Sequence, residues 1–135
     1  MTTGEKLPKN VVLAIEDCGF TSVKDIFTDQ SIRKYHIPPK LVIPQASLVC
    51  KLINGFFFGE GSAVEQLKKS KTPTLFIHGD KDDYVPTWMV YELYNAKPQP
   101  KELWIVPNAG HDDSYRLYRE EYTEKVKQFT DKYIQ

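Results

Sequence analysis

The chain has 135 residues, a length that fits one domain with its own core and is too short for two ordinary domains. Its hydrophobic share of 41% and charged share of 27% are close to those of globular proteins, which argues against disordered and fibrous classes. Eighteen basic and eighteen acidic residues cancel, with no basic block beyond Lys68 and Lys69, so nothing supports nucleic-acid binding and the charge favours a neutral or small substrate.

The first predicted strand runs from Val11 to Ile15. It is apolar on both faces, which is typical of a parallel strand covered by helices on both sides. The residues before it show neither the apolar core of a signal peptide nor a lipidation motif, so we expect a soluble chain, cytoplasmic by default. Cys18 and Cys50 have no metal-like spacing and are expected to be free, buried thiols.

The segment from Thr21 to Lys71 is long, interrupted by prolines and rich in apolar residues that look exposed. Capping-box patterns at Ser22–Asp25 and Ser62–Glu65 predict that a short helix begins at each. The most apolar stretch, Leu41 to Phe58, is broken by polar residues and is therefore a poor candidate for crossing a bilayer. We expect the segment to be a helical lid inserted between the first and second strands.

Two further strands are predicted, from Thr74 to Ile77 and from Glu102 to Val106. Between them a helix opens at Pro86 and stops before Pro98. The alternation of strands and helices predicts an α/β fold. A last helix is predicted from Ser114 to Tyr133, with one apolar stripe along it. The stripe comprises Tyr118, Tyr122, Val126, Phe129 and Tyr133.

Polar side chains that could do chemistry follow the last two predicted strands. Asp82 comes just after the second strand, and His111 follows the third. Because α/β sheets bind ligands beyond the carboxyl ends of their parallel strands, neighbouring strand ends can bring these two side chains within hydrogen-bond reach. In a hydrolytic triad, the acid is a carboxylate that orients an imidazole, and the imidazole is the base. From the residues alone, a solvated turn carboxylate and a loop histidine stay open as the alternative.

Other chemistries have weaker support. His78 and several aspartates could converge with Asp82 and His111 on a divalent ion, but no helix-borne ligand spacing marks a metal site. The aspartates are Asp80, Asp83, Asp112 and Asp113. No glycine-rich loop follows any strand, which disfavours phosphate and dinucleotide binding. We therefore predict neither a metal nor a cofactor. His78 is expected to satisfy local hydrogen bonds.

The order of these motifs resembles a known superfamily. The pattern His-Gly-x-x-Asp-x-x-Val-Pro at His78 to Pro86, followed by Gly110-His111 after another strand, resembles the C-terminal part of the α/β hydrolases. Within that superfamily, the runs Ile15–Ser22 and Lys71–Asp80 are similar to a bacterial branch of peptidase- or esterase-like members. The resemblance covers nearly the whole chain.

The resemblance implies a truncated α/β-hydrolase fold, with about three parallel strands equivalent to the family's sixth, seventh and eighth, flanking helices and a lid over residues 21–71. It implies that Asp82 is the triad acid and His111 the triad base. The implied chemistry is hydrolysis of an ester or a short peptide by acyl transfer to water, without a cofactor.

The family's nucleophile elbow, Gly-x-Ser-x-Gly, does not occur in the sequence. The closest string, Gly59 to Ala63, has the wrong spacing, and Ser62 is expected to cap a helix. Met1 to Lys9 would then correspond to the end of the helix that follows the elbow. We expect a C-terminal portion of a serine hydrolase that is inactive alone, because the oxyanion hole is also missing. The alternative is a non-catalytic interaction or scaffold domain that kept the fold.

The edge of the first strand predicts that the chain associates with another copy of itself. In the family this edge pairs with a further strand, so in this sequence the run from Val11 to Ile15 would present an unpaired apolar edge. Such edges favour strand addition or self-association. We therefore expect a homodimer or higher oligomer joined through this strand, with no membrane segment and no nucleic acid among its partners.

Overall fold

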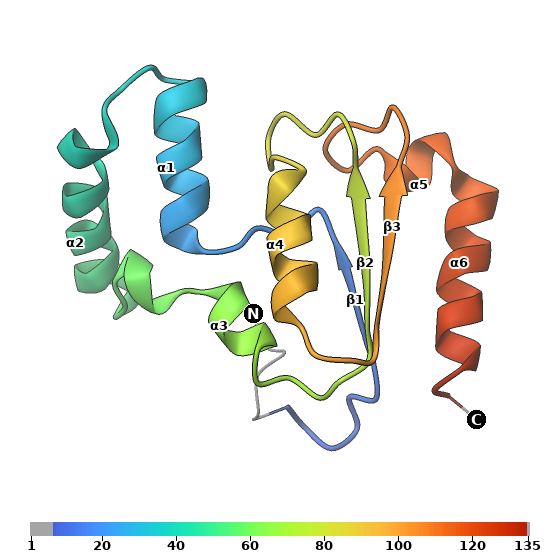
Figure 1. Ribbon diagram of the computed structural model, residues 1–135. Helices are drawn as coiled ribbons and strands as arrows, with labels where there is room; N and C mark the ends of the chain where they lie inside the picture. Colours follow the sequence, from blue (N-terminus) through green and yellow to red (C-terminus); the bar gives the residue numbers. More distant parts are fainter. Residues whose placement is uncertain (1–6, 135) are drawn as a thin grey trace.

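The computed structural model describes residues 7–134 (Figure 1). The expected helix end over Met1–Lys9 falls mainly outside these residues. None of the described helices combines the length and the apolar character that crossing a bilayer requires. In chain order the elements are β1 (Ala14–Asp17), α1 (Val23–Arg33), η1 (Pro39–Leu41), α2 (Ile43–Asn54), η2 (Phe58–Glu60), α3 (Ala63–Leu67), β2 (Thr74–Gly79), α4 (Trp88–Ala96), β3 (Lys101–Val106), α5 (Ser114–Leu117) and α6 (Arg119–Asp131).

Three parallel strands form one sheet in the order β1-β2-β3. This confirms the predicted α/β class, with its three parallel strands and flanking helices. Every residue of β2 is buried, because this strand has a neighbour on each side and helices on both faces. β1 and β3 are only partly buried, so the expectation of full cover on both faces is right for β2 alone.

β1 begins at Ala14 rather than at Val11, where the sequence predicted it. Its neighbour β2 begins at Thr74, and the Ala14 N–H donates to the carbonyl of Pro73 at 2.8 Å. Upstream, the Val11 N–H donates to the carbonyl of Pro8 at 3.0 Å and closes a turn instead. A strand extends only as far as its neighbour offers backbone partners, and among the described residues those before Ala14 have no such partner.

Helices cover both faces of the sheet (Figure 1). α3 and α4 lie on one face, and α6 lies on the other. β2 supplies both cores because its alternate side chains point to opposite faces. The core under α3 and α4 comprises Leu67, Phe76, Val90 and Leu93. The core under α6 comprises Leu75, Ile77, Val106, Ala109 and Phe129.

The C-terminal helix differs from its prediction. The expected stripe from Tyr118 to Tyr133 does pack against the sheet core. The expectation of one continuous helix is wrong, because Tyr118 leaves the helical region, with φ −129° and ψ 46°, and separates α5 from α6. α5 contacts β2 while α6 lies along the face of the sheet. One straight helix could not make both contacts.

The segment between β1 and β2 carries α1, α2 and α3. As predicted, Ser22 and Ser62 cap helices: their hydroxyls accept the N–H of Asp25 at 3.0 Å and of Glu65 at 3.2 Å. α1 is attached to the body through a small core around Ile26. α2 lies beyond α1 at the periphery (Figure 1) and leaves several apolar side chains exposed.

Candidate functional site

The loop after β2 holds the carboxylate of Asp82 in a fixed orientation. Its Oδ1 accepts the backbone N–H groups of Tyr84 at 2.9 Å and of Val85 at 2.8 Å. The side chain is fully buried. A buried carboxylate that accepts two backbone N–H groups cannot rotate freely. Its second oxygen, Oδ2, therefore points in one defined direction.

The imidazole of His111 lies against this second oxygen. The loop after β3 brings its Nδ1 to 2.8 Å from Oδ2 of Asp82. With the Nδ1 proton donated to the carboxylate, Nε2 is left to accept a proton from another group. The imidazole is 31% exposed, so solvent or a substrate can reach it. The ring of Tyr84 packs beside it, with centroids 4.8 Å apart. The structure thus brings together the two residues that the sequence singled out.

A second histidine supports the same carboxylate from inside the protein. His78, near the end of β2, is fully buried, and its Nε2 lies 2.9 Å from the carbonyl of Val85. The same nitrogen lies 3.4 Å from Oδ2 of Asp82. As expected from the sequence, His78 makes local hydrogen bonds. It lies under the Asp82 loop and has no contact with solvent.

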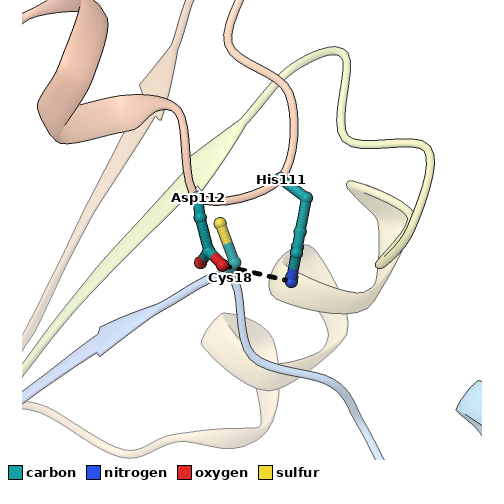
Figure 2. A group of neighbouring side chains, drawn as sticks. All are labelled: Cys18, His111 and Asp112. Carbon is teal, nitrogen blue, oxygen red and sulfur yellow. Dashed lines mark ion pairs between the residues drawn. The ribbon is translucent and has the colours of Figure 1, made fainter.

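The neighbouring aspartates do not share this site. Asp80 and Asp83 are exposed in the loop after β2. Asp113 pairs with the guanidinium of Arg116 at 2.8 Å. Asp112 is the exception, because its Oδ2 lies 3.7 Å from Nε2 of His111 (Figure 2).

Cys18 lies at the same end of the sheet, which the sequence analysis did not anticipate (Figure 2). It is buried, as predicted, whereas Cys50 is only half-buried. Burial raises the pKa of the Cys18 thiol to about 12; the Asp112 N–H opposes this rise, and the charges of Asp17 and Asp82 add to it. The thiol therefore stays protonated at neutral pH and is a poor nucleophile. The sequence did offer one signal for Cys18, because this residue follows the end of a strand, as Asp82 and His111 also do.

Glu16 is a second buried group that the sequence analysis missed. It lines a cavity of about 500 Å³ beside β1, together with residues of α3 and α4. Among residues 7–134, neither carboxylate oxygen accepts a hydrogen bond of good geometry, although the backbone of Gly19 lies close to it. Burial raises its pKa from 4.5 to about 7; the backbone of Gly19 opposes the rise, and Asp17 adds to it. The carboxylate is thus a source of instability at neutral pH.

A second cavity lies between α1 and the site. Its volume is about 280 Å³. It is mostly aromatic and apolar, with the ammonium-bearing side chain of Lys34 at its edge, and it shares Tyr84 with His111. The lining residues are Phe20, Ile26, Phe27, Gln30, Lys34, Tyr35 and Tyr84. Such a cavity suits the apolar part of a small molecule.

Gly79 sets the distance between β2 and the loop that carries His111. A Cβ added there would overlap the backbone of Ala109 and Gly110. We expect Gly79→Ala to force this loop outward and to lower the free energy of unfolding by about 1–3 kcal/mol in urea denaturation. Gly59→Ala is the matched control, because a Cβ there meets nothing within 4 Å. Equal stabilities of the two variants would contradict the close approach.

Comparisons with known proteins agree with this fold. The pattern of the prolyl oligopeptidase family matches residues 45–135. The uncharacterized protein YqkD of Bacillus subtilis is 33% identical over 117 residues, which are 87% of this chain and 38% of YqkD. The human alpha/beta hydrolase domain-containing protein 17C is 31% identical over 74 residues, which are 55% of this chain and 22% of that protein.

Solved structures show the same fold. The esterase Pf2001 of Pyrococcus furiosus superposes with a TM-score of 0.66 at 20% identity, covering 94% of this chain and 47% of the esterase. The chain therefore spans less than half the length of YqkD and of this esterase. The residues that match the family pattern include both Asp82 and His111.

Proposed function

Because the chain belongs to the prolyl oligopeptidase family, within the α/β-hydrolase superfamily, we propose that Asp82 and His111 are the acid and base of a serine-hydrolase triad. The reaction would be hydrolysis of an ester or peptide bond by acyl transfer to water. The observation that carries this proposal is the 2.8 Å contact between Oδ2 of Asp82 and Nδ1 of His111, made by a fully buried carboxylate and a solvent-accessible imidazole.

The geometry supports a division of roles within the pair. Asp82 keeps the proton of His111 on Nδ1, so that the lone pair of Nε2 can take the proton of a serine hydroxyl during attack. The imidazolium that forms is stabilised by the buried carboxylate and then gives its proton to the leaving group. Two backbone N–H groups hold the other oxygen of Asp82, so that Oδ2 keeps facing the imidazole.

The nucleophile and the oxyanion hole belong, in this proposal, to residues outside these 135. No Gly-x-Ser-x-Gly elbow occurs in the sequence. Ser62, the nearest candidate by pattern, uses its hydroxyl to cap α3. Cys18 is held protonated by its burial. The greater length of YqkD and of the esterase Pf2001 is consistent with this division of the site.

The segment over residues 21–71 would serve as a lid over the substrate. α1 contacts the loop of the acid directly: the amide of Gln30 donates to the carbonyl of Tyr84 at 2.7 Å, and the guanidinium of Arg33 donates to the carbonyl of Asp83 at 3.0 Å. The aromatic cavity beside Tyr84 would hold the apolar part of the substrate. Self-association through the open edge of β1 stays a prediction.

A fluorophosphonate probe, which labels activated serines, tests this proposal. We expect no labelling of the chain alone. We expect labelling when the chain is joined to an upstream segment that carries a Gly-x-Ser-x-Gly elbow, and loss of that labelling with His111→Ala. Labelling of the chain alone would contradict the assignment of the nucleophile. Labelling of the joined protein that survives His111→Ala would contradict the role of the base.

The alternative is a non-catalytic interaction domain that kept the hydrolase fold. It predicts that no upstream segment restores labelling, although the joined protein folds. The buried acid and its paired imidazole favour the catalytic proposal, because a purely structural domain gains nothing from a partly exposed histidine held by a desolvated carboxylate.

A further inference from the structure

Three side chains from two loops meet at the carboxyl end of the sheet (Figure 2). The Sγ of Cys18, a ring nitrogen of His111 and a carboxylate oxygen of Asp112 all lie within 4.8 Å of one another. Cys18 follows β1, and the other two follow β3. We propose that these three residues form a binding site for Zn²⁺.

The donor set selects the kind of ion. A thiolate, an imidazole and a carboxylate are the three side chains that bind zinc in proteins, whereas Mg²⁺ and Ca²⁺ take oxygen ligands. With bonds of about 2.0–2.3 Å, tetrahedral zinc separates its ligand atoms by roughly 3.3–3.7 Å. Nε2 of His111 and Oδ2 of Asp112 already lie 3.7 Å apart. The sulfur of Cys18 lies within 4.8 Å of a ring nitrogen of His111 and of a carboxylate oxygen of Asp112.

The orientation of His111 is that of a metal ligand. Its Nδ1 faces Asp82, so Nε2 is the nitrogen that faces Asp112 and can coordinate. Metal-bound histidines commonly donate their other N–H to a carboxylate, which fixes the ring and raises its basicity. Three protein ligands leave a fourth position for water, and the exposed side chain of Asp112, at 79%, gives the ion a path from solvent.

A buried histidine also lies near the sulfur of Cys18. His78 is fully buried, and its Nδ1 has no hydrogen-bond partner among the described residues. One of its ring nitrogens lies within 4.8 Å of the Cys18 sulfur and of the Asp82 carboxylate. The thiol therefore has a buried imidazole and a buried carboxylate among its neighbours. A cation bound to the sulfur gains from the charge of Asp82 beneath it.

Binding exchanges one ion for one proton. Zn²⁺ takes the place of the thiol proton of Cys18, and this proton leaves to solvent. The lone pair of His111 Nε2 is donated to the ion. No oxidation or reduction is involved. If the proposed function holds, a bound ion removes the base and blocks hydrolysis, whereas the binding itself does not depend on that function.

Isothermal calorimetry with Zn²⁺ on the full 135-residue chain tests the site. We expect one ion per chain, and a loss of affinity of at least about tenfold with Asp112→Asn. Asparagine suits this position because Asp112 has φ 58°, a conformation that asparagine tolerates. Asp80→Asn, an exposed carboxylate in the neighbouring loop, is the matched control and should leave the affinity unchanged.

Cobalt provides a readout of the sulfur ligand. Co²⁺ bound to the chain should give a thiolate charge-transfer absorption that Cys18→Ser abolishes and Cys50→Ser retains, since Cys50 lies on α2 away from the cluster. Equal zinc affinity of wild type and Asp112→Asn, or a cobalt spectrum without the thiolate band in the wild type, would overturn the proposal. Both measurements use the metal alone, so a failed proposed function would not affect them.

Discussion

Replacing Asp82 with asparagine is expected to lower kcat by about 10⁴-fold in the complete hydrolase, meaning this chain joined to a segment that carries the serine elbow. Asparagine keeps the shape of the side chain and an oxygen for the N–H groups of Tyr84 and Val85. Its amide, however, presents an N–H to Nδ1 of His111. The ring proton then moves to Nε2, which can no longer accept the proton of the serine.

The measurement is the initial rate of hydrolysis of an activated ester at saturating substrate. Asp80→Asn provides the control, because it makes the same chemical change on an exposed carboxylate two residues away. Asn is preferred to alanine because alanine would leave two buried N–H groups unpaired and would destabilise the loop itself. A loss of less than about tenfold for Asp82→Asn would contradict its role as the triad acid.

Replacing Glu16 with glutamine is expected to stabilise the 135-residue chain at pH 8 by about 2–3 kcal/mol. Burial raises the pKa of Glu16 to about 7 in the folded chain, whereas the ordinary value for this carboxyl, expected in the unfolded chain, is 4.5. Since the folded pKa is raised, the unfolded chain loses this proton first. Stability therefore falls as pH rises from about 4.5 to 7 and is constant above that range.

Urea denaturation at several pH values checks this prediction. The stabilisation by Glu16→Gln should be largest above pH 7 and should decline toward zero as the pH falls below 4.5, where Glu16 becomes protonated in both states. Glu92→Gln is the matched control, because Glu92 is exposed on α4. A Glu16→Gln effect that does not change with pH would show that charge burial is not its cause.

The sequence predicted much of the site because each candidate residue follows a strand. Parallel strands place their carboxyl ends at one edge of the sheet, so Asp82 and His111 could be expected to meet there without knowledge of the packing. The caps at Ser22 and Ser62 were also predictable, since a hydroxyl that accepts the N–H three residues later is a local interaction.

Other features depended on neighbours that the sequence pattern does not show. The start of β1 follows from where Pro73 and Thr74 lie on the next strand. The break at Tyr118 follows from two helices that must contact different parts of the sheet. Helical periodicity continues through this position, so no local pattern could have revealed the break.

The sequence by itself therefore determined the α/β class, the alternation of parallel strands with helices, and the candidate acid and base. Local periodicity and capping carry that information, because they depend on residues a few positions apart. Only the tertiary structure decided that Cys18 lies beside His111 and Asp112, and that the carboxylate of Glu16 is buried. Cys18 is far from His111 in the chain, and burial and distance exist only once the sheet and its helices have packed together.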